Sequence, residues 1–459
     1  MTVSKAWPGA LLGATVSLAA ATATALAQTV PAQTAPAQTA PAQTAPAASA
    51  TDSAEQPATA APDAPPPGFW IDGIHLSAQG DVGLSFNPAD PKQNFGQLFT
   101  DKPNTVILNQ ILLTANKPLD PKATGFDWGF KFQGMYGSDA RYTHFLGELD
   151  RVDPYDRNQF DIVEANVLAH LPIAFDGGID IKAGQYPTPL GFETIDPSTN
   201  PFYSHSYIFQ FGLPFKHTGV LTVSHVSGLL DVYLGADTGE NTTFGPLGDN
   251  NSAAAFLGGV NLTMMDGNLV ILALTHIGPE NPSRDLSPRF NADGYYRYEN
   301  DIVATYKATS DLTLVTELNL IRDDFGATGY ATGKPSASNA FGIAQYASYT
   351  LTDTLTLNGR AEVFRDDNNF FVAGYGANNG ADRFQMGFPT PLTAALHATT
   401  YGEMTVGVTY KPANLPAAIS GLMVRPEIRY DRDLGGNRAF DNNRSNGSLT
   451  MASDMVLTF

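Results

Sequence analysis

Apolar and polar residues alternate along most of the chain from Trp70 onward. Between Ile74 and Phe86, every second residue is apolar or glycine, and the residues between them are polar or glycine. Successive side chains of a β-strand point to opposite faces, so this period of two indicates strands with one apolar face. In other segments the polar face carries charge, as with Arg360 and Glu362 between apolar neighbours.

The alternation recurs often enough to define a sheet protein. Strands are predicted at residues 72–86, 104–116, 125–137, 159–171, 178–186, 214–225, 228–237, 253–264, 267–276, 295–307, 311–322, 339–350, 354–365, 397–411, 420–431 and 448–459. Charge on one face and apolar residues on the other suit a wall between lipid and water. The predicted fold is therefore an all-β, transmembrane antiparallel β-barrel of about 16 strands. Segments 214–225 and 267–276 are ambiguous, because 269–274 is apolar throughout, so fourteen or eighteen strands stay open.

The connections between these strands alternate in length. Short ones, such as 226–228 and 265–267, alternate with long ones, such as 87–103, 138–158, 186–213 and 365–396. Bacterial outer-membrane barrels have short periplasmic turns and long extracellular loops. The phase of the alternation therefore predicts that both termini are periplasmic.

Composition agrees with a membrane barrel. Charged residues make up 15% of the chain, against about a quarter in soluble domains. No run of about 18 apolar residues follows the N-terminal region, which argues against helical membrane spans. The chain has no cysteine, which excludes disulfides and thiolate metal sites, and its formal charge of -19 argues against nucleic-acid binding.

The first 67 residues have a different character. Lys5, an apolar stretch over 10–21 and Ala25-Leu26-Ala27 predict a cleaved secretory signal peptide at 1–27. Repeats of Pro-Ala-Gln-Thr-Ala then predict a disordered periplasmic linker at 28–67, because such composition cannot bury enough apolar surface to fold. The barrel domain is expected at 68–459.

The last predicted strand carries a further signal. Leu449, Met451, Met455, Leu457 and Phe459 share one face of it. We expect this row to face lipid. The aromatic residue at the C-terminal end of the last strand resembles the assembly signal of outer-membrane proteins, so we expect Phe459 to be a signal for the barrel-assembly machinery.

A long segment carries a family resemblance. Residues 184–219, which read GQYPTPLGFETIDPSTNPFYSHSYIFQFGLPFKHTG, resemble the hallmark stretch of the OmpL-like β-barrel porins, and Asn109-Gln110 leading into residues 117–120 is similar to the family's early pattern. The resemblance extends over about 68–459 and implies an outer-membrane porin. It also implies, by position, that this third long loop folds into the lumen as a constriction. The expected constriction residues are Glu193, Asp196, His205 and Lys216; a structural clasp without a role in selectivity is the alternative.

Charges on the predicted inward faces are mixed in sign. The expected lumen wall contains Lys131, Lys182, Arg297, Arg360, Arg425 and Arg429 together with Glu164, Asp180, Glu299, Glu317, Glu362, Glu403 and Glu427. Neither sign dominates, so Glu193 and Asp196 at the narrowest point are expected to give a weak cation preference.

Catalytic signals are weak. The chain lacks the Gly-x-Ser-x-Gly elbow, the His-Glu-x-x-His motif, a Walker loop and a dinucleotide fingerprint. Ser204-His205-Ser206 contains a nucleophile and a base, but adjacent residues seldom orient each other for catalysis. Residues 366–369 and 441–443 resemble fragments of calcium loops without the complete ligand spacing.

The sequence therefore predicts a non-enzymatic porin in the outer membrane of a Gram-negative bacterium. It would form a water-filled channel for passive diffusion of small hydrophilic solutes, without cofactor or metal. A substrate-selective channel for sugars or organic acids is the first alternative and a barrel enzyme the second. The expected partners are outer-membrane lipid, small hydrophilic solutes and the assembly machinery, with a homotrimer left open and no nucleic acid.

Overall fold

The computed structural model describes residues 69–71, 73–145, 148–149, 152, 157–244, 248–249, 251–281, 294–326, 334–373, 397–416 and 418–459. The predicted signal peptide and linker, 1–27 and 28–67, lie outside the described residues. No described helix is long and apolar enough to cross a membrane.

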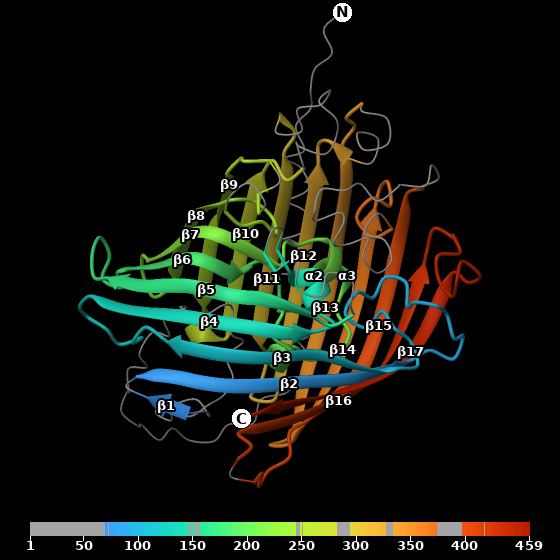
Figure 1. The fold of residues 1–459 in the computed structure, drawn as a ribbon, viewed down its shortest axis with the longest axis horizontal. Helices are drawn as coiled ribbons and strands as arrows, with labels where there is room; N and C mark the ends of the chain where they lie inside the picture. Colours follow the sequence, from blue (N-terminus) through green and yellow to red (C-terminus); the bar gives the residue numbers. More distant parts are fainter. Residues whose placement is uncertain are drawn as a thin grey trace, which may run out of the picture. The chain divides into compact units, whose positions relative to one another are not determined.

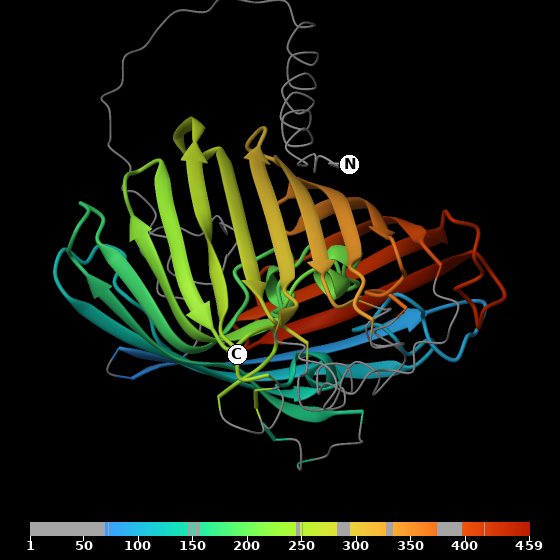
Figure 2. The same cartoon turned by 90° about the horizontal axis from the view of Figure 1, so that it is seen from above.

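Antiparallel strands form a closed ring, as Figure 1 and Figure 2 show. Each strand pairs with the next along the chain, and the last strand pairs with the first, from Met451 opposite Phe86 to Thr458 opposite Gln79. The sixteen strands of the ring are β2 (Ile74–Phe86), β3 (Val106–Lys117), β4 (Asp127–Gly137), β5 (Gln159–Leu171), β6 (Ile179–Pro187), β7 (Lys216–His225), β8 (Leu230–Asp237), β9 (Ala255–Met264), β10 (Leu269–Gly278), β11 (Arg297–Lys307), β12 (Leu312–Asp323), β13 (Ser338–Thr352), β14 (Leu355–Asp366), β15 (Thr399–Tyr410), β16 (Gly421–Asp433) and β17 (Gly447–Thr458). A further strand, β1 (Phe69–Ile71), pairs with the start of β2.

The predicted strand count is confirmed. Each of the sixteen predicted segments corresponds to one strand of the ring, and the two ambiguous segments are β7 and β10. β7 begins at Lys216 rather than at Pro214. Proline has no backbone N–H to give to the ladder, which fits a start beyond it.

The connections alternate in length around the whole ring. The short ones include 226–229, 265–268 and 353–354, and the long ones include 87–105, 138–158, 188–215 and 367–398. Two of the long connections contain short helices: α2 (Ala140–Thr143) in the second, and η1 (Pro197–Thr199) and α3 (Tyr207–Phe211) in the third. A fourth short helix, η2 (Met265–Gly267), makes the turn between β9 and β10.

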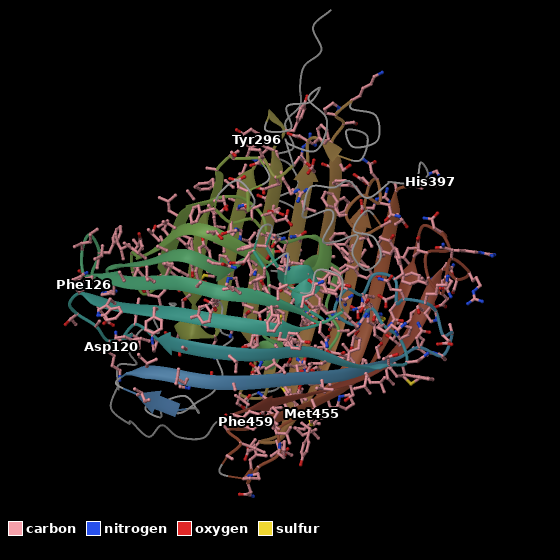
Figure 3. The ribbon with its side chains drawn as sticks, in the orientation of Figure 1. Asp120, Phe126, Tyr296, His397, Met455 and Phe459 are labelled. Atoms are coloured by element: carbon pink, nitrogen blue, oxygen red, sulfur yellow. The ribbon has the colours of Figure 1, made fainter. Side chains whose placement is uncertain are left out.

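The strands expose apolar side chains and bury polar ones. In β2, Leu84 is 39% exposed whereas Asp81 is 2% exposed. Trp128, Met404 and Ile428 are more than half exposed, while charged residues such as Glu299 are fully buried. Phe126, Met455 and Phe459 lie at the outline of the molecule in Figure 3. A soluble protein would bury the apolar face, so this inversion is the pattern of a wall with lipid outside.

The ring also encloses a hydrophobic cluster. Tyr207, Ile208, Phe209, Phe211 and Phe215 are at most 5% exposed and form part of one apolar cluster with side chains from several strands. All five come from α3 or the residues just after it. The third long connection is therefore packed as tightly as a protein core.

Two strand glycines leave room for that connection. A Cβ atom added at Gly83 in β2 would lie 2.2 Å from Cζ of Tyr203, and one added at Gly342 in β13 would lie 2.6 Å from Cγ1 of Ile208. Any side chain at either position would displace the residue packed against it.

Candidate functional site

The candidate site is the third long connection, residues 188–215 between β6 and β7, which we call the loop-3 segment. Its short helices have their own caps. Asp196 Oδ1 accepts a hydrogen bond from the backbone N–H of Ser198 at the start of η1, at 2.9 Å. Ser206 Oγ accepts one from the N–H of Phe209 at the start of α3, at 3.0 Å. Such caps satisfy N–H groups that a helix leaves unpaired, so the segment is ordered by its own sequence as well as by its surroundings.

Wall carboxylates hold the backbone of the loop-3 segment. Glu427 in β16 accepts hydrogen bonds from the N–H groups of Tyr203 and Ser204, at 2.8 and 3.1 Å. Glu317 in β12 accepts one from the N–H of Phe192, at 3.1 Å. Hydrogen bonds from amides to a carboxylate are about twice as strong as neutral ones. These side chains therefore fix the path of the segment.

A third wall carboxylate lies at the N-terminus of α3. Glu362 in β14 accepts hydrogen bonds from the N–H groups of Tyr207 and Ile208, at 2.6 and 2.8 Å. These are the first two residues of α3, whose N–H groups have no partner within the helix.

Wall arginines hold the carbonyl groups of the same segment. Arg360 donates to the carbonyl of Ser204 at 2.8 Å, and Arg429 donates to that of His205 at 2.5 Å. Arg425 donates to the carbonyls of Pro197 and Asn200, both at 2.7 Å. Each arginine also pairs with a wall carboxylate, namely Glu403, Asp431 and Asp454 respectively.

Glu193 lies at the centre of this network. It pairs with Arg360 and with Nδ1 of His205, both at 2.7 Å, and accepts from the hydroxyl of Tyr346 at 3.0 Å. Burial raises its pKa, but the charge of Arg360 and the hydrogen bond from His205 outweigh that effect and lower the pKa to about 2. Burial lowers the pKa of His205. Glu193 is therefore a carboxylate whose charge Arg360 compensates.

The other two predicted constriction residues lie elsewhere. Asp196 is half-buried and accepts hydrogen bonds from Ser198 and from Nε2 of Gln79, the latter at 2.8 Å. Lys216 is the first residue of β7 and is buried against Asp161 of β5, at 2.6 Å. The structure thus brings Glu193 and His205 together but not Lys216.

The predicted wall charges fall into two groups. Glu317, Arg360, Glu362, Arg425, Glu427 and Arg429 all bond to the loop-3 segment, as described above. Lys131 instead pairs with Glu164 at 2.8 Å. Lys182 is half-buried, and its Nζ lies 5.9 Å from the ring centre of Tyr186.

Several contacts to the segment were not predicted. Gln110 in β3 donates to the carbonyl of Ile195 at 2.9 Å, and Tyr346 in β13 bonds to Glu193. The first long connection contributes Phe99, whose ring centre lies 4.9 Å from that of His205. Strand alternation could have placed Gln110 on the inward face. It could not identify Tyr346, because an inward aromatic residue looks like an outward one in the sequence.

The residues with weak catalytic signals have other contacts. Ser204 Oγ accepts from Arg360 at 3.2 Å, and Ser206 Oγ caps α3. Nδ1 of His205 faces Glu193 rather than either serine hydroxyl. These contacts account for the three side chains in structural terms.

Known structures share the fold at low sequence identity. OmpF of Salmonella typhi in complex with daunomycin superposes with a TM-score of 0.51 at 10% identity, over 85% of this chain and 99% of that one. OprB of Pseudomonas putida gives 0.50 at 13%, over 84% and 94%. The anion-selective porin of Comamonas acidovorans gives 0.50 at 9%, over 84% and 99%. At such identities the likeness concerns the fold alone.

The family is established by sequence. No curated protein matches the chain. The family model described as "Putative beta-barrel porin-2, OmpL-like" matches residues 73–459, which is nearly the whole ring of strands together with the loop-3 segment. The chain therefore belongs to the OmpL-like β-barrel porin family.

Proposed function

We propose that this protein is an outer-membrane porin through which small hydrophilic solutes diffuse passively, and that the loop-3 segment folds into its lumen as the constriction. The observation that carries the proposal is the set of strands that bond to the segment. They include β2 through Gln79, β3 through Gln110, β12 through Glu317 and β16 through Glu427. Bonds from one connection to strands so widely spread around a closed ring support a path through its interior.

The proposed orientation follows from the lengths of the connections. The long connections would be extracellular and the short ones periplasmic, as in other barrels of this class. Both ends of the chain would then be periplasmic, in the outer membrane of a Gram-negative bacterium. Residues 1–27 would direct secretion. Protease accessibility of tags inserted at 226–229 and at 434–446 in intact cells tests this orientation, and only the second tag should be cleaved.

We further propose a weak cation preference that depends mainly on Asp196. Glu193 contributes little, because Arg360 compensates its charge. Among the described residues, no lysine or arginine lies within ion-pair distance of Asp196, which is half-buried. Salt screens charges over about 8 Å at physiological strength, so only charges at the narrowest point affect permeation.

Single-channel recording in planar bilayers tests the proposal. Purified mature protein should give discrete conductance steps and a small reversal potential of cation-selective sign under a salt gradient. Protein that folds, as judged by heat-modifiable migration on gels, but gives no conductance would contradict the channel function.

Tight packing of the loop-3 segment favours a second candidate, a narrow substrate-selective channel for sugars or organic acids. The segment's aromatic residues and the charges around them are buried, which favours a narrow passage. In that case ionic conductance would be small and one solute class would block it in a concentration-dependent way. A passive diffusion pore would show no such block.

Phe459 has a proposed role in assembly. Its backbone N–H bonds to the carbonyl of Ala78 at 2.8 Å, and its side chain is 48% exposed. Phe459→Asp should lower the amount of folded protein in the outer membrane far more than Thr458→Asp. Equal amounts of the two variants would contradict a signal at Phe459. A homotrimer remains a prediction, to be checked by native mass measurement in detergent.

A further inference from the structure

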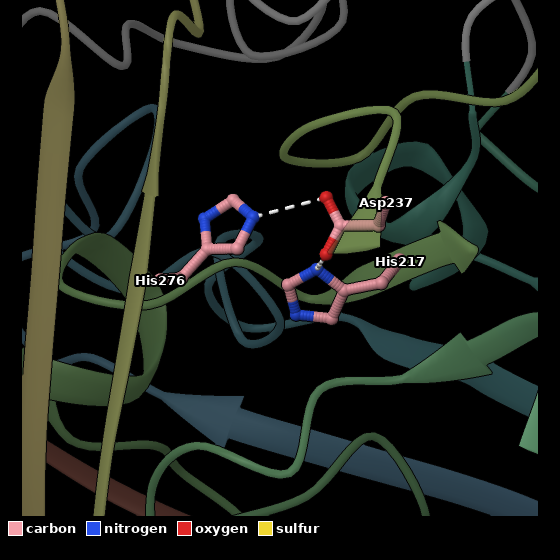
Figure 4. Close-up of side chains that lie close together, drawn as sticks. All are labelled: His217, Asp237 and His276. Atoms are coloured by element: carbon pink, nitrogen blue, oxygen red, sulfur yellow. Dashed lines mark hydrogen bonds and ion pairs between the residues drawn. The ribbon is translucent and has the colours of Figure 1, made fainter. Parts of the chain in front are cut away.

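A second cluster of polar side chains lies outside the network around the loop-3 segment. His217 at the start of β7, Asp237 at the end of β8 and His276 near the end of β10 converge at one rim of the ring (Figure 4). One nitrogen or oxygen atom from each lies within 4.8 Å of those of the other two. All three side chains are fully buried.

Each histidine is oriented by a partner on its far side. Nδ1 of His276 lies 2.8 Å from Oε2 of Glu299, and Nε2 of His217 lies 2.9 Å from the hydroxyl of Thr188. This leaves Nε2 of His276 and Nδ1 of His217 directed at the carboxylate of Asp237. Metal-binding histidines are commonly held in this way, with the nitrogen away from the metal bonded to a carboxylate or another oxygen.

Of the two inward contacts, that of His276 is a hydrogen bond and that of His217 is not. Nδ1 of His217 and Oδ2 of Asp237 lie 3.1 Å apart, yet both atoms are buried without a hydrogen-bond partner. Nε2 of His276 lies 3.1 Å from Oδ1 of Asp237. If the Nδ1–H of a neutral His276 donates its hydrogen bond to Glu299, then a lone pair of Nε2 faces a carboxylate oxygen. That arrangement requires a positive charge between them, either a proton or a metal ion.

The charge around the cluster is strongly negative. Asp237 and Glu299 contact His276 directly, and Glu280 lies 3.8 Å from it. Arg297 contributes a positive charge, which is shared between Glu240 and Asp323. Five carboxylates thus lie near this guanidinium, and all of them except Glu240 are buried. Buried anions are costly unless cations compensate them.

We propose that His217, Asp237 and His276 bind a divalent transition-metal ion of the Zn²⁺ class. Two imidazoles and one carboxylate are typical zinc ligands, whereas Mg²⁺ and Ca²⁺ prefer oxygen atoms alone. Bonds of about 2.0–2.2 Å in a tetrahedron place ligand atoms roughly 3.3–3.5 Å apart. The two contacts of 3.1 Å use different oxygens of Asp237, and the three ligand atoms lie within 4.8 Å of one another, so the side chains would have to draw together around the ion.

The ion would be structural and would fix the loop-3 segment at both ends. Thr188 begins the segment and bonds to His217, which lies just beyond its end. A metal on His217 would connect this junction to β8 and β10. The site is independent of the proposed transport function, and it requires no solute to pass.

Metal binding to the folded full-length mature protein tests the proposal. Protein refolded without metal is given Zn²⁺, freed of excess ion and analysed for bound zinc. One zinc per chain is expected, with loss of this zinc in a His217→Gln/His276→Gln variant. Glu299→Gln, which removes only an outer partner, should weaken binding by about 10- to 100-fold.

The matched control is His170→Gln/His225→Gln. These histidines also contact carboxylates, those of Asp180 and Asp231, but they are half-buried. The control should keep the zinc. Less than stoichiometric binding by the unaltered chain would overturn the proposal and leave protonated histidines as the compensating charge. Retention in the His217/His276 variant, or equal loss in the control, would also overturn it.

Folding is checked separately by heat-modifiable migration on gels. If the double variant fails to fold, Asp237→Asn keeps the shape of the cluster while it removes the ligand charge, and it should lose the zinc. X-ray absorption at the zinc edge of the unaltered protein should show mixed nitrogen and oxygen ligands. A shell of oxygen atoms alone would contradict the site.

Discussion

Charged side chains on two parts of the ring differ in their burial and in their partners. On β14, the side chain of Arg360 is fully buried and bonds to the loop-3 segment, to Glu193 and to Glu403. On β4, Lys131 keeps 21% of its side chain exposed and has Glu164 as its partner. Charges of the same kind on the same sheet therefore have different roles. Those on β12, β14 and β16 hold the segment, whereas the lysines Lys131 on β4 and Lys182 on β6 remain partly exposed.

We call the part of the ring formed by β12, β14 and β16 the segment-bound side. Removal of a charge there should have the largest effect, a loss of free energy of unfolding. Arg360→Met would leave Glu193 and Glu403 buried without their cation, and breaking a buried ion pair costs about 3–5 kcal/mol. Lys182→Met on the other side should change the free energy of unfolding by less than about 0.5 kcal/mol. Urea titrations of folding into lipid vesicles measure both, and similar losses would remove the distinction between the two sides.

A smaller effect is expected at the N-terminus of α3. Glu362→Gln replaces one of the two oxygens that accept from the Tyr207 and Ile208 N–H groups by an NH₂ group, and a buried N–H group left without an acceptor costs about 1–3 kcal/mol. The segment should become more mobile, so open-channel current noise should rise. Glu164→Gln is the matched control on the opposite side, and its noise should equal that of the unaltered channel.

Acid should weaken the segment-bound side through Glu193. Its pKa is lowered from 4.5 to about 2 in the folded protein, so its ionised form stabilises the fold above about pH 4.5. That contribution is lost as the pH falls through the folded value. The difference in unfolding free energy between the unaltered protein and Glu193→Gln should therefore shrink between pH 5 and pH 2. A constant difference would mean that Glu193 is not ionised in the folded state.

The smallest expected effect is on selectivity. Replacing Glu193 by Gln and Asp196 by Asn together should move the reversal potential toward zero. Asp196→Asn alone should cause most of the shift, because Arg360 already compensates Glu193. If Glu193→Gln alone has the larger effect, its charge is less compensated than the structure indicates. If neither change has an effect, the segment does not form the constriction.

The strands were predictable because the barrel wall imposes a period of two over the whole ring. Segments such as 354–365 expose Val363 and bury Glu362 as the alternation requires. Lys216 was predicted in the constriction from the position of its loop in the resemblance. The structure has it as the first residue of β7, with its side chain paired with Asp161 of β5.

Contacts between side chains of strands that are distant along the chain could not be predicted from the sequence. The wall carboxylates that bond to the segment have no recognisable spacing in the sequence. The same holds for His217, Asp237 and His276. The ligands come from three strands whose separations depend on the intervening loops. A motif arises when one element supplies the residues, and here the pairing of β7 with β8, and of β8 and β10 with β9, brings them together.

The loop-3 segment also joins the place where the ring closes. It packs on Gly83 of β2 through Tyr203, and it bonds to Arg425 of β16, which in turn pairs with Asp454 of β17. β2 is among the first strands to leave the ribosome and β17 is the last. The segment therefore has no complete docking surface until the final strands have arrived. Docking and closure should occur as one cooperative step, so that a barrel halted before β16 would still have an undocked loop-3 segment and could be recognised as unfinished.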